Sequence, residues 1–124
     1  LSVRCGVAAT AAEVSFFLIC PADHPWLRPE TVAGLLAAAR AHPDHSLFQP
    51  VHGGRGGHPV GLRARPHGTP PVDLRREILS AGSAWTLREL LHTHADRLLR
   101  WPCGDPGCVR DLDTPRDLDP PIQG

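Results

Sequence analysis

The first stretch that can carry chemistry is CPADHP, from Cys20 to Pro25, which contains a carboxylate and an imidazole side by side. Asp23 follows the apolar run VSFFLIC, and two prolines stiffen the loop that holds it. A carboxylate beyond the carboxyl end of a buried strand can bind Mg²⁺ and, through it, a polyphosphate. The same residue types fit a simpler role, in which Asp23 only caps the turn before Trp26. His24 fits a solvated loop position as well as a chemical role.

A second stretch of this kind is RGGHPV, from Arg55 to Val60. Glycines allow backbone N–H groups to approach an anion, and the Arg55 guanidinium can make a paired contact with a phosphate or a carboxylate. An ordinary glycine-rich hairpin turn has the same composition. The stretch is not a P-loop, because no Gly-Lys-Ser/Thr follows. It is not a dinucleotide-binding turn either, because an extended segment follows it rather than a helix.

The third stretch is DLDTPRDL, from Asp111 to Leu118. Thr114 and Asp117 have the spacing of a helix cap, and we assign them that role. Asp113 is the better metal candidate. Two carboxylates from separate strand ends, Asp23 and Asp113, are therefore expected to converge on one Mg²⁺, an arrangement that suits nucleotidyl transfer because charge builds up on phosphate oxygens.

The elements that must position these residues begin with an apolar strand over Val14–Cys20, continuous enough to be buried on both faces as in a parallel sheet. Pro29–Ala41 has a proline in its first turn and an apolar stripe, which predicts a helix. The stripe consists of Val32, Leu35, Leu36 and Ala39. Ser46–Val51 predicts a second strand, which makes a βαβ unit with parallel strands.

The remaining elements are expected in the order hairpin, strand, two helices and two strands. The predicted segments are a helix within Val3–Ala12, a glycine turn over 53–57, an extended His58–Arg63, a loop over Gly68–Pro71, helices over Val72–Leu79 and Trp85–Thr93, and strands over Arg97–Pro102 and Val109–Leu112. This order predicts a single α/β domain over residues 1–124 with a mixed, mostly parallel sheet.

Composition excludes several classes of partner. Thirteen basic and thirteen acidic residues give a formal charge of zero, so a surface for nucleic acid or for an anionic membrane is not expected. The sequence has no run of 18 apolar residues, so a membrane span is not expected. The four cysteines are expected to be free and mostly buried thiols, which is typical of a cytoplasmic protein.

Three motifs in order resemble one family, the nucleotidyltransferases that attach CMP or GMP to the molybdenum cofactor. The motifs are LLxxDxPxxxPET at Leu18–Thr31, PVxGGRxGHPV at Gln49–Val60 and DxDTPxDL within Pro106–Leu118. The opening at Ser2–Val7 is similar to the family's S-L-x-x-G-L helix start. The resemblance implies a Rossmann-like three-layer α/β fold and transfer of a nucleoside monophosphate from CTP or GTP to a phosphorylated, molybdopterin-type acceptor, with Mg²⁺ and release of pyrophosphate.

The resemblance also implies roles for individual residues. Asp23 would be the principal Mg²⁺ ligand and a catalytic residue, with Asp113 as its partner. Arg55 and His58 would contact the phosphate or the pterin of the acceptor. Ser2 and Gly6, at a helix start, would lie near the nucleotide.

One departure from the family is large, since its first strand and its GGxSxRMGxxK loop have no counterpart here. The chain is therefore expected to be N-terminally truncated relative to the family. Three explanations stay open: a piece of a longer protein, a truncated non-catalytic relative that serves as a binding or dimerisation domain, or completion by another chain. The expected partners are accordingly a second copy of the chain or a molybdoenzyme, and a sugar or another small phosphorylated acceptor is an alternative substrate.

Overall fold

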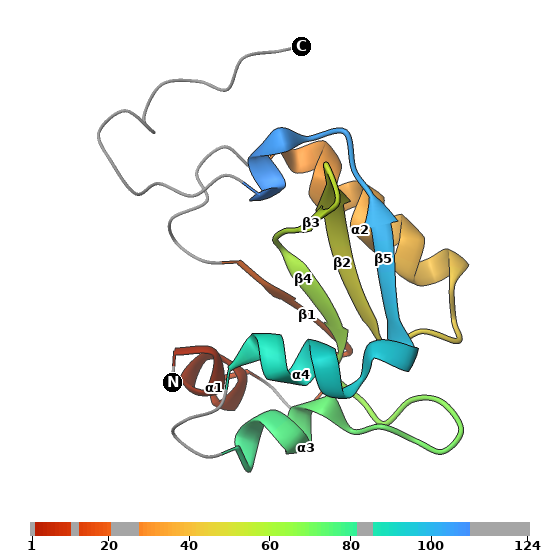
Figure 1. The fold of residues 1–124 in the computed structure, drawn as a ribbon. Coiled ribbons are helices and arrows are strands. Elements are labelled where there is room, and N and C mark those ends of the chain that lie inside the picture. Colours follow the sequence, from red (N-terminus) through yellow and green to blue (C-terminus); the bar gives the residue numbers. More distant parts are fainter. Residues whose placement is uncertain (1, 11–12, 21–27, 82–85, 110–124) are drawn as a thin grey trace.

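A computed structural model of the chain describes residues 2–10, 13–20, 28–81 and 86–109. Within these ranges the helices and strands follow one another as shown in Figure 1. They are α1 (Ser2–Ala8), β1 (Phe16–Ile19), α2 (Pro29–Ala41), β2 (Leu47–His52), β3 (Arg55–Gly56), β4 (Val60–Arg63), α3 (Leu74–Leu79), α4 (Leu87–Thr93) and β5 (Leu98–Pro102), with short 3₁₀ turns at Ala95–Arg97 and Pro106–Val109. The predicted α/β class is confirmed.

The sheet is mixed, and β2 lies at its centre. β4 lies between β1 and β2 and is antiparallel to both, whereas β5 pairs with the other side of β2 in parallel. β3 folds back on the end of β2 as a hairpin. β1, β2 and β5 therefore run in one direction, as expected, but only β2 and β5 are parallel neighbours. The expectation of a mostly parallel sheet is correct for the common direction of β1, β2 and β5. It is wrong for the pairing of β1 with β2, because β4 lies between these two strands of the predicted βαβ unit.

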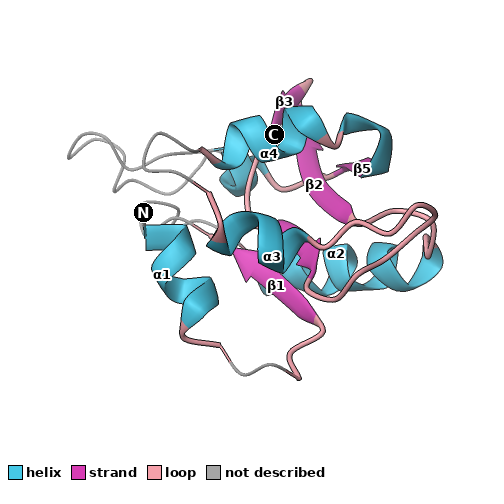
Figure 2. Ribbon diagram, turned by 90° about the horizontal axis from the view of Figure 1, so that it is seen from below, coloured by secondary structure: helices cyan, strands magenta, loops and turns pink. Residues whose placement is uncertain are grey.

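Helices cover both faces of the sheet (Figures 1 and 2). On one face, α1, α3 and α4 bury Val7, Ile78 and Leu90 against inward-facing strand residues such as Leu47 and Leu62. On the other face, α2 packs Leu35 and Ala39 onto Phe48. This arrangement is the three-layer architecture that the family resemblance implies.

Helix α2 begins and ends where the sequence predicts, but it buries a slightly different stripe. Its buried residues are Thr31, Leu35, Ala38 and Ala39, whereas Val32 and Leu36 of the predicted stripe are only partly buried. Gly34 allows the helix to approach β5, since a Cβ at this position would lie 2.5 Å from the Trp101 ring. The buried face of α2 thus includes Thr31 and Ala38, which lie beside the predicted stripe.

Three smaller expectations need correction. β1 is not buried on both faces, because Leu18 is 40% exposed. Val109, expected in a strand, lies in a 3₁₀ turn. The cysteines are free as predicted, but Cys5 and Cys20 are exposed rather than buried.

Among the described residues, no helix is both long enough and apolar enough to cross a lipid bilayer.

Candidate functional site

The edge of the sheet at which β1, β2 and β5 end, and at which β4 begins, brings together most of the residues of interest. We call it the carboxyl edge. Ile19 pairs with Val60, so the end of β1 lies beside the segment that carries His58. The last pair of β2 and β5, Val51 with Pro102, lies at the same edge. In open α/β sheets this is the edge where ligands bind.

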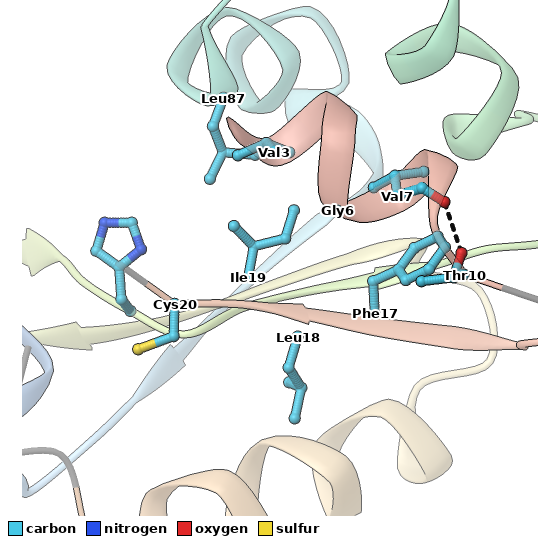
Figure 3. Close-up of a pocket in the computed structure, with 10 residues that line it drawn as sticks. Val3, Gly6, Val7, Thr10, Phe17, Leu18, Ile19, Cys20 and Leu87 are labelled. Atoms are coloured by element: carbon cyan, nitrogen blue, oxygen red, sulfur yellow. Dashed lines mark hydrogen bonds between the residues drawn. The ribbon is translucent and has the colours of Figure 1, made fainter. Parts of the chain in front are cut away.

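A pocket of about 670 Å³ opens at this edge between α1 and β1 (Figure 3). Its walls are mostly apolar, and its lining residues are Val3, Gly6, Val7, Thr10, Phe17, Leu18, Ile19, Cys20, His58 and Leu87. Figure 3 shows Phe17 and Ile19 pointing from β1 toward α1, whereas Leu18 points to the face that α2 covers. Apolar walls with few polar groups suit a flat ring such as a nucleobase or a pterin.

Two of the sequence-predicted site residues, Gly6 and His58, line this pocket. Gly6 leaves space there, because a Cβ at this position would find no atom within 4 Å. The backbone of His58 is fixed, since its N–H donates to the carbonyl of Cys108 at 2.8 Å. The structure thus brings together one residue expected near the nucleotide and one expected near the acceptor.

The position before His58 requires glycine for a packing reason. A Cβ at Gly57 would collide with the backbone carbonyl of Cys108. Gly57 also donates its N–H to the carbonyl of Pro50 at 2.8 Å. Gly57 of the RGGHPV stretch therefore allows the 3₁₀ turn at Pro106–Val109 to pack against this segment. This packing fixes the position of His58 beside the pocket.

The other predicted site residues lie elsewhere or outside the described ranges. Arg55 is exposed on β3, in the hairpin beyond the end of β2, and it does not line the pocket. Ser2 begins α1, and its side chain is not described. Asp23, His24 and Asp113 lie outside the described residues. Their predicted convergence on a metal stays a prediction.

Where Thr10 lines the pocket, a polar contact joins the turn after α1 to α3. The Thr10 hydroxyl donates to the carbonyl of Val7 at 2.6 Å and accepts from Arg75 Nη1 at 2.7 Å. The Arg75 guanidinium also lies 5.9 Å from the centre of the Phe17 ring. These contacts hold α1 in place over β1, which keeps the pocket open.

Asp105 is a residue of the carboxyl edge that the sequence reasoning missed. It is 5% exposed, and its carboxylate accepts from the Thr31 hydroxyl at 2.7 Å, from the backbone N–H of Arg28 at 3.0 Å and from that of Gly107 at 2.8 Å. Arg28 is the N-cap residue that precedes α2, and its side chain makes no capping hydrogen bond. Asp105 therefore caps α2 from a distant part of the chain.

The pKa of Asp105 reflects this environment. Burial alone would raise it, but the hydrogen bonds from Thr31, Arg28 and Gly107, together with the charge of Arg28, outweigh burial and hold the pKa below its ordinary value. Asp105 is thus an ionised anchor. A usable signal for it was the turn-forming stretch CGDPG, which follows β5.

The described residues of the pocket do not by themselves make a magnesium site. None of those that line it is a carboxylate, and the oxygens of Asp105 are already occupied by protein donors. Mg²⁺ prefers carboxylate oxygens. The expected magnesium ligands, Asp23 and Asp113, lie outside the described residues, so this site stays a prediction.

The chain is thus an α/β domain with a mostly apolar pocket at the carboxyl edge of its sheet. Comparison with protein-family models gives one match, to the MobA-like NTP transferase domain over residues 1–98. The chain belongs to this family, which identifies it as a nucleotidyltransferase-type domain. No curated protein was found to match the chain.

Proposed function

We propose that the protein transfers CMP or GMP from CTP or GTP to the phosphate of a molybdopterin-type molybdenum cofactor. The observation that supports this most is the pocket between α1 and β1, which lies at the carboxyl edge of a sheet from the NTP transferase family. An oxygen of the acceptor phosphate attacks the α-phosphorus of the nucleotide. The bond from that phosphorus to the β-phosphate oxygen breaks, and pyrophosphate leaves.

The chemistry of the pocket walls supports a ligand with a flat heterocycle. Phe17, Ile19 and Leu87 supply apolar surface, and His58 supplies a ring nitrogen that can hydrogen-bond to a phosphate or a pterin. Mg²⁺, when bound, would neutralise the charge that develops on the phosphates. Asp23 and Asp113 are the residues we propose to hold it.

The test is pyrophosphate release by the full-length protein. We expect release with CTP or GTP only when the molybdenum cofactor is present, and we expect Asp23→Ala to abolish it. Asp96→Asn is the matched control, because Asp96 is 78% exposed and lies in the last turn before β5. Release that is undiminished in Asp23→Ala would refute the metal role of this carboxylate. Release with a sugar phosphate in place of the cofactor would support the alternative acceptor class.

A second candidate function, a dimerisation domain, is favoured by one observation. β1 ends the strand order of the described sheet, and Leu18 in its middle is an exposed large apolar side chain. Light scattering on the wild-type protein and on Leu18→Lys separates the two functions. A dimer that the substitution dissociates would support this candidate, whereas a monomer in both would exclude it.

A further inference from the structure

The turn that joins α2 to β2 carries two histidines and an aspartate within four residues, in the sequence His42-Pro43-Asp44-His45. One potential ligand atom from each of His42, Asp44 and His45 lies within 4.8 Å of the other two. Asp44 Oδ1 lies 3.1 Å from His45 Nδ1. The two imidazole rings stand edge to face, with their centres 5.7 Å apart.

We propose that His42, Asp44 and His45 form a binding site for a divalent transition metal such as Zn²⁺. Two imidazole nitrogens and one carboxylate oxygen are a ligand set that Zn²⁺ accepts, whereas Mg²⁺ and Ca²⁺ prefer oxygen ligands only. Tetrahedral zinc needs its ligand atoms about 3.4 Å apart. His42 and Asp44 are exposed, so small rotations of their side chains can close the remaining gap, and water completes the coordination.

The backbone of this turn is already held in place, which lowers the entropic cost of binding. Arg63 on β4 donates Nε–H to the carbonyl of His45 at 2.7 Å, and Nη2–H to the carbonyls of Ala39 at 2.7 Å and of His42 at 3.2 Å. One guanidinium thus fixes the carbonyls of both histidines. The ring of His67 contacts the carbonyl of Pro43 between them.

The local charges partly oppose and partly favour a cation. The guanidinium of Arg63 is a positive charge close to the turn, but its N–H groups face carbonyl oxygens. The carboxylate of Asp44 supplies the opposite charge.

The site lies at the opposite edge of the sheet from the pocket. His45 is two residues before the first residue of β2, whereas the pocket lies where β1 ends and β4 begins. Bound metal would tie the end of α2 to the start of β2 without entering the pocket. The proposal therefore does not rest on the proposed transferase function.

The experiment is a calorimetric titration of the protein with ZnCl₂, which measures the heat of zinc binding. Apart from any zinc binding to thiols, we expect a binding event that His42→Ala and His45→Ala each weaken by at least about tenfold, because even a residue that only orients a ligand costs that much when it is removed. Asp44→Asn, which keeps the shape and removes the charge, should weaken it as well. His92→Ala on α4 is the control and should bind as the wild type does.

Two features of the design keep the result clear. Every variant keeps the exposed thiols of Cys5 and Cys20, so heat from zinc binding to thiols is common to all titrations. Amide chemical shifts recorded during the titration should move at residues 42–46. Identical zinc isotherms for the wild type and for His42→Ala, or shifts confined to the cysteines, would overturn the proposal.

Discussion

At the scale of single residues, Asp105 is the anchor of the carboxyl edge. Its carboxylate holds the first turn of α2 to the chain that follows β5, through bonds to Arg28, Thr31 and Gly107. Hydrogen bonds to a charged acceptor contribute more than neutral ones, and a buried donor that loses its acceptor is costly. Asp105 therefore fixes where α2 begins relative to the end of β5.

We expect Asp105→Asn to lower the free energy of unfolding by about 2 kcal/mol, because the amide NH₂ faces donors where the carboxylate accepted. Urea unfolding monitored by tryptophan fluorescence measures this change. Asp96→Asn, at an exposed position, should stay within about 0.5 kcal/mol of the wild type. Equal stability of the two variants would show that the bonds to Asp105 do not hold α2.

The same carboxylate makes stability depend on pH. Its pKa is below the ordinary value of 3.8 in the folded protein, because the hydrogen bonds outweigh burial. The unfolded chain therefore takes up this proton at a higher pH than the folded chain does. The stabilisation is present above the unfolded pKa and is lost as the pH falls through the folded pKa. In a series of urea midpoints from neutral to acid pH, Asp105→Asn should lose less stability than the wild type below about pH 4; parallel curves would contradict this.

Cysteine reactivity is a third property of single residues. Burial, followed by the neighbouring Cys103, raises the pKa of Cys108 to about 12, so almost no thiolate forms at neutral pH. Cys5 and Cys20 are exposed. Iodoacetamide followed by peptide mass spectrometry should label Cys5 and Cys20 and leave Cys108 unmodified in the folded protein. Rapid labelling of Cys108 without unfolding would contradict the packing of the C-terminal turn.

At the scale of elements, we expect alanine substitutions at Gly34 of α2 and at Gly6 of α1 to change stability in opposite directions. Gly34 of α2 faces the Trp101 ring, and a Cβ there would require that ring to shift. Gly34→Ala should lower the free energy of unfolding by about 1–3 kcal/mol, as overpacking does. Gly6 of α1 faces open space, so Gly6→Ala should raise stability by up to about 1 kcal/mol, because alanine favours the helix. Thermal unfolding of the two variants provides the measurement, and a loss of stability in both would contradict the open space at Gly6.

Local signals predicted the elements well, and pairing between distant segments was the part they missed. Pro29 at the helix start and the apolar stripe defined α2 at both ends. The insertion of β4 between β1 and β2 was not predictable from spacing, because the register of Phe16 with Arg63 joins residues far apart in the chain. The exposure of Leu18 has the same origin, since β1 ends the described strand order.

In the candidate site, too, some residues could be predicted from local motifs, and others depend on contacts between distant segments. Gly6 and His58 were predicted as site residues, and they meet at one pocket because β1 and β4 pair beside it. Asp105 was missed, because its role depends on contacts with Arg28 and Thr31 that are more than 70 positions away. A buried carboxylate that caps a distant helix leaves no periodic signal in the sequence.

At the scale of the whole molecule, the two edges of the sheet have different chemistry. The carboxyl edge has an apolar pocket bordered by His58 and Cys20. The opposite edge has the turn with His42, Asp44 and His45, held by Arg63. A change at one edge should leave the other intact, because β2 (Leu47–His52) separates them and distant sites that share no partner usually act additively.

The central claim is that a nucleotide binds in the pocket at the carboxyl edge. Amide chemical shifts measured during titration with CTP and GTP test it most directly. We expect the largest changes at Gly6, Cys20 and His58 with at least one of the two nucleotides, and we expect His58→Ala to weaken binding while the exposed-site variant His92→Ala does not. Shifts confined to other parts of the protein, or binding that is unchanged in His58→Ala, would contradict the assignment of this pocket.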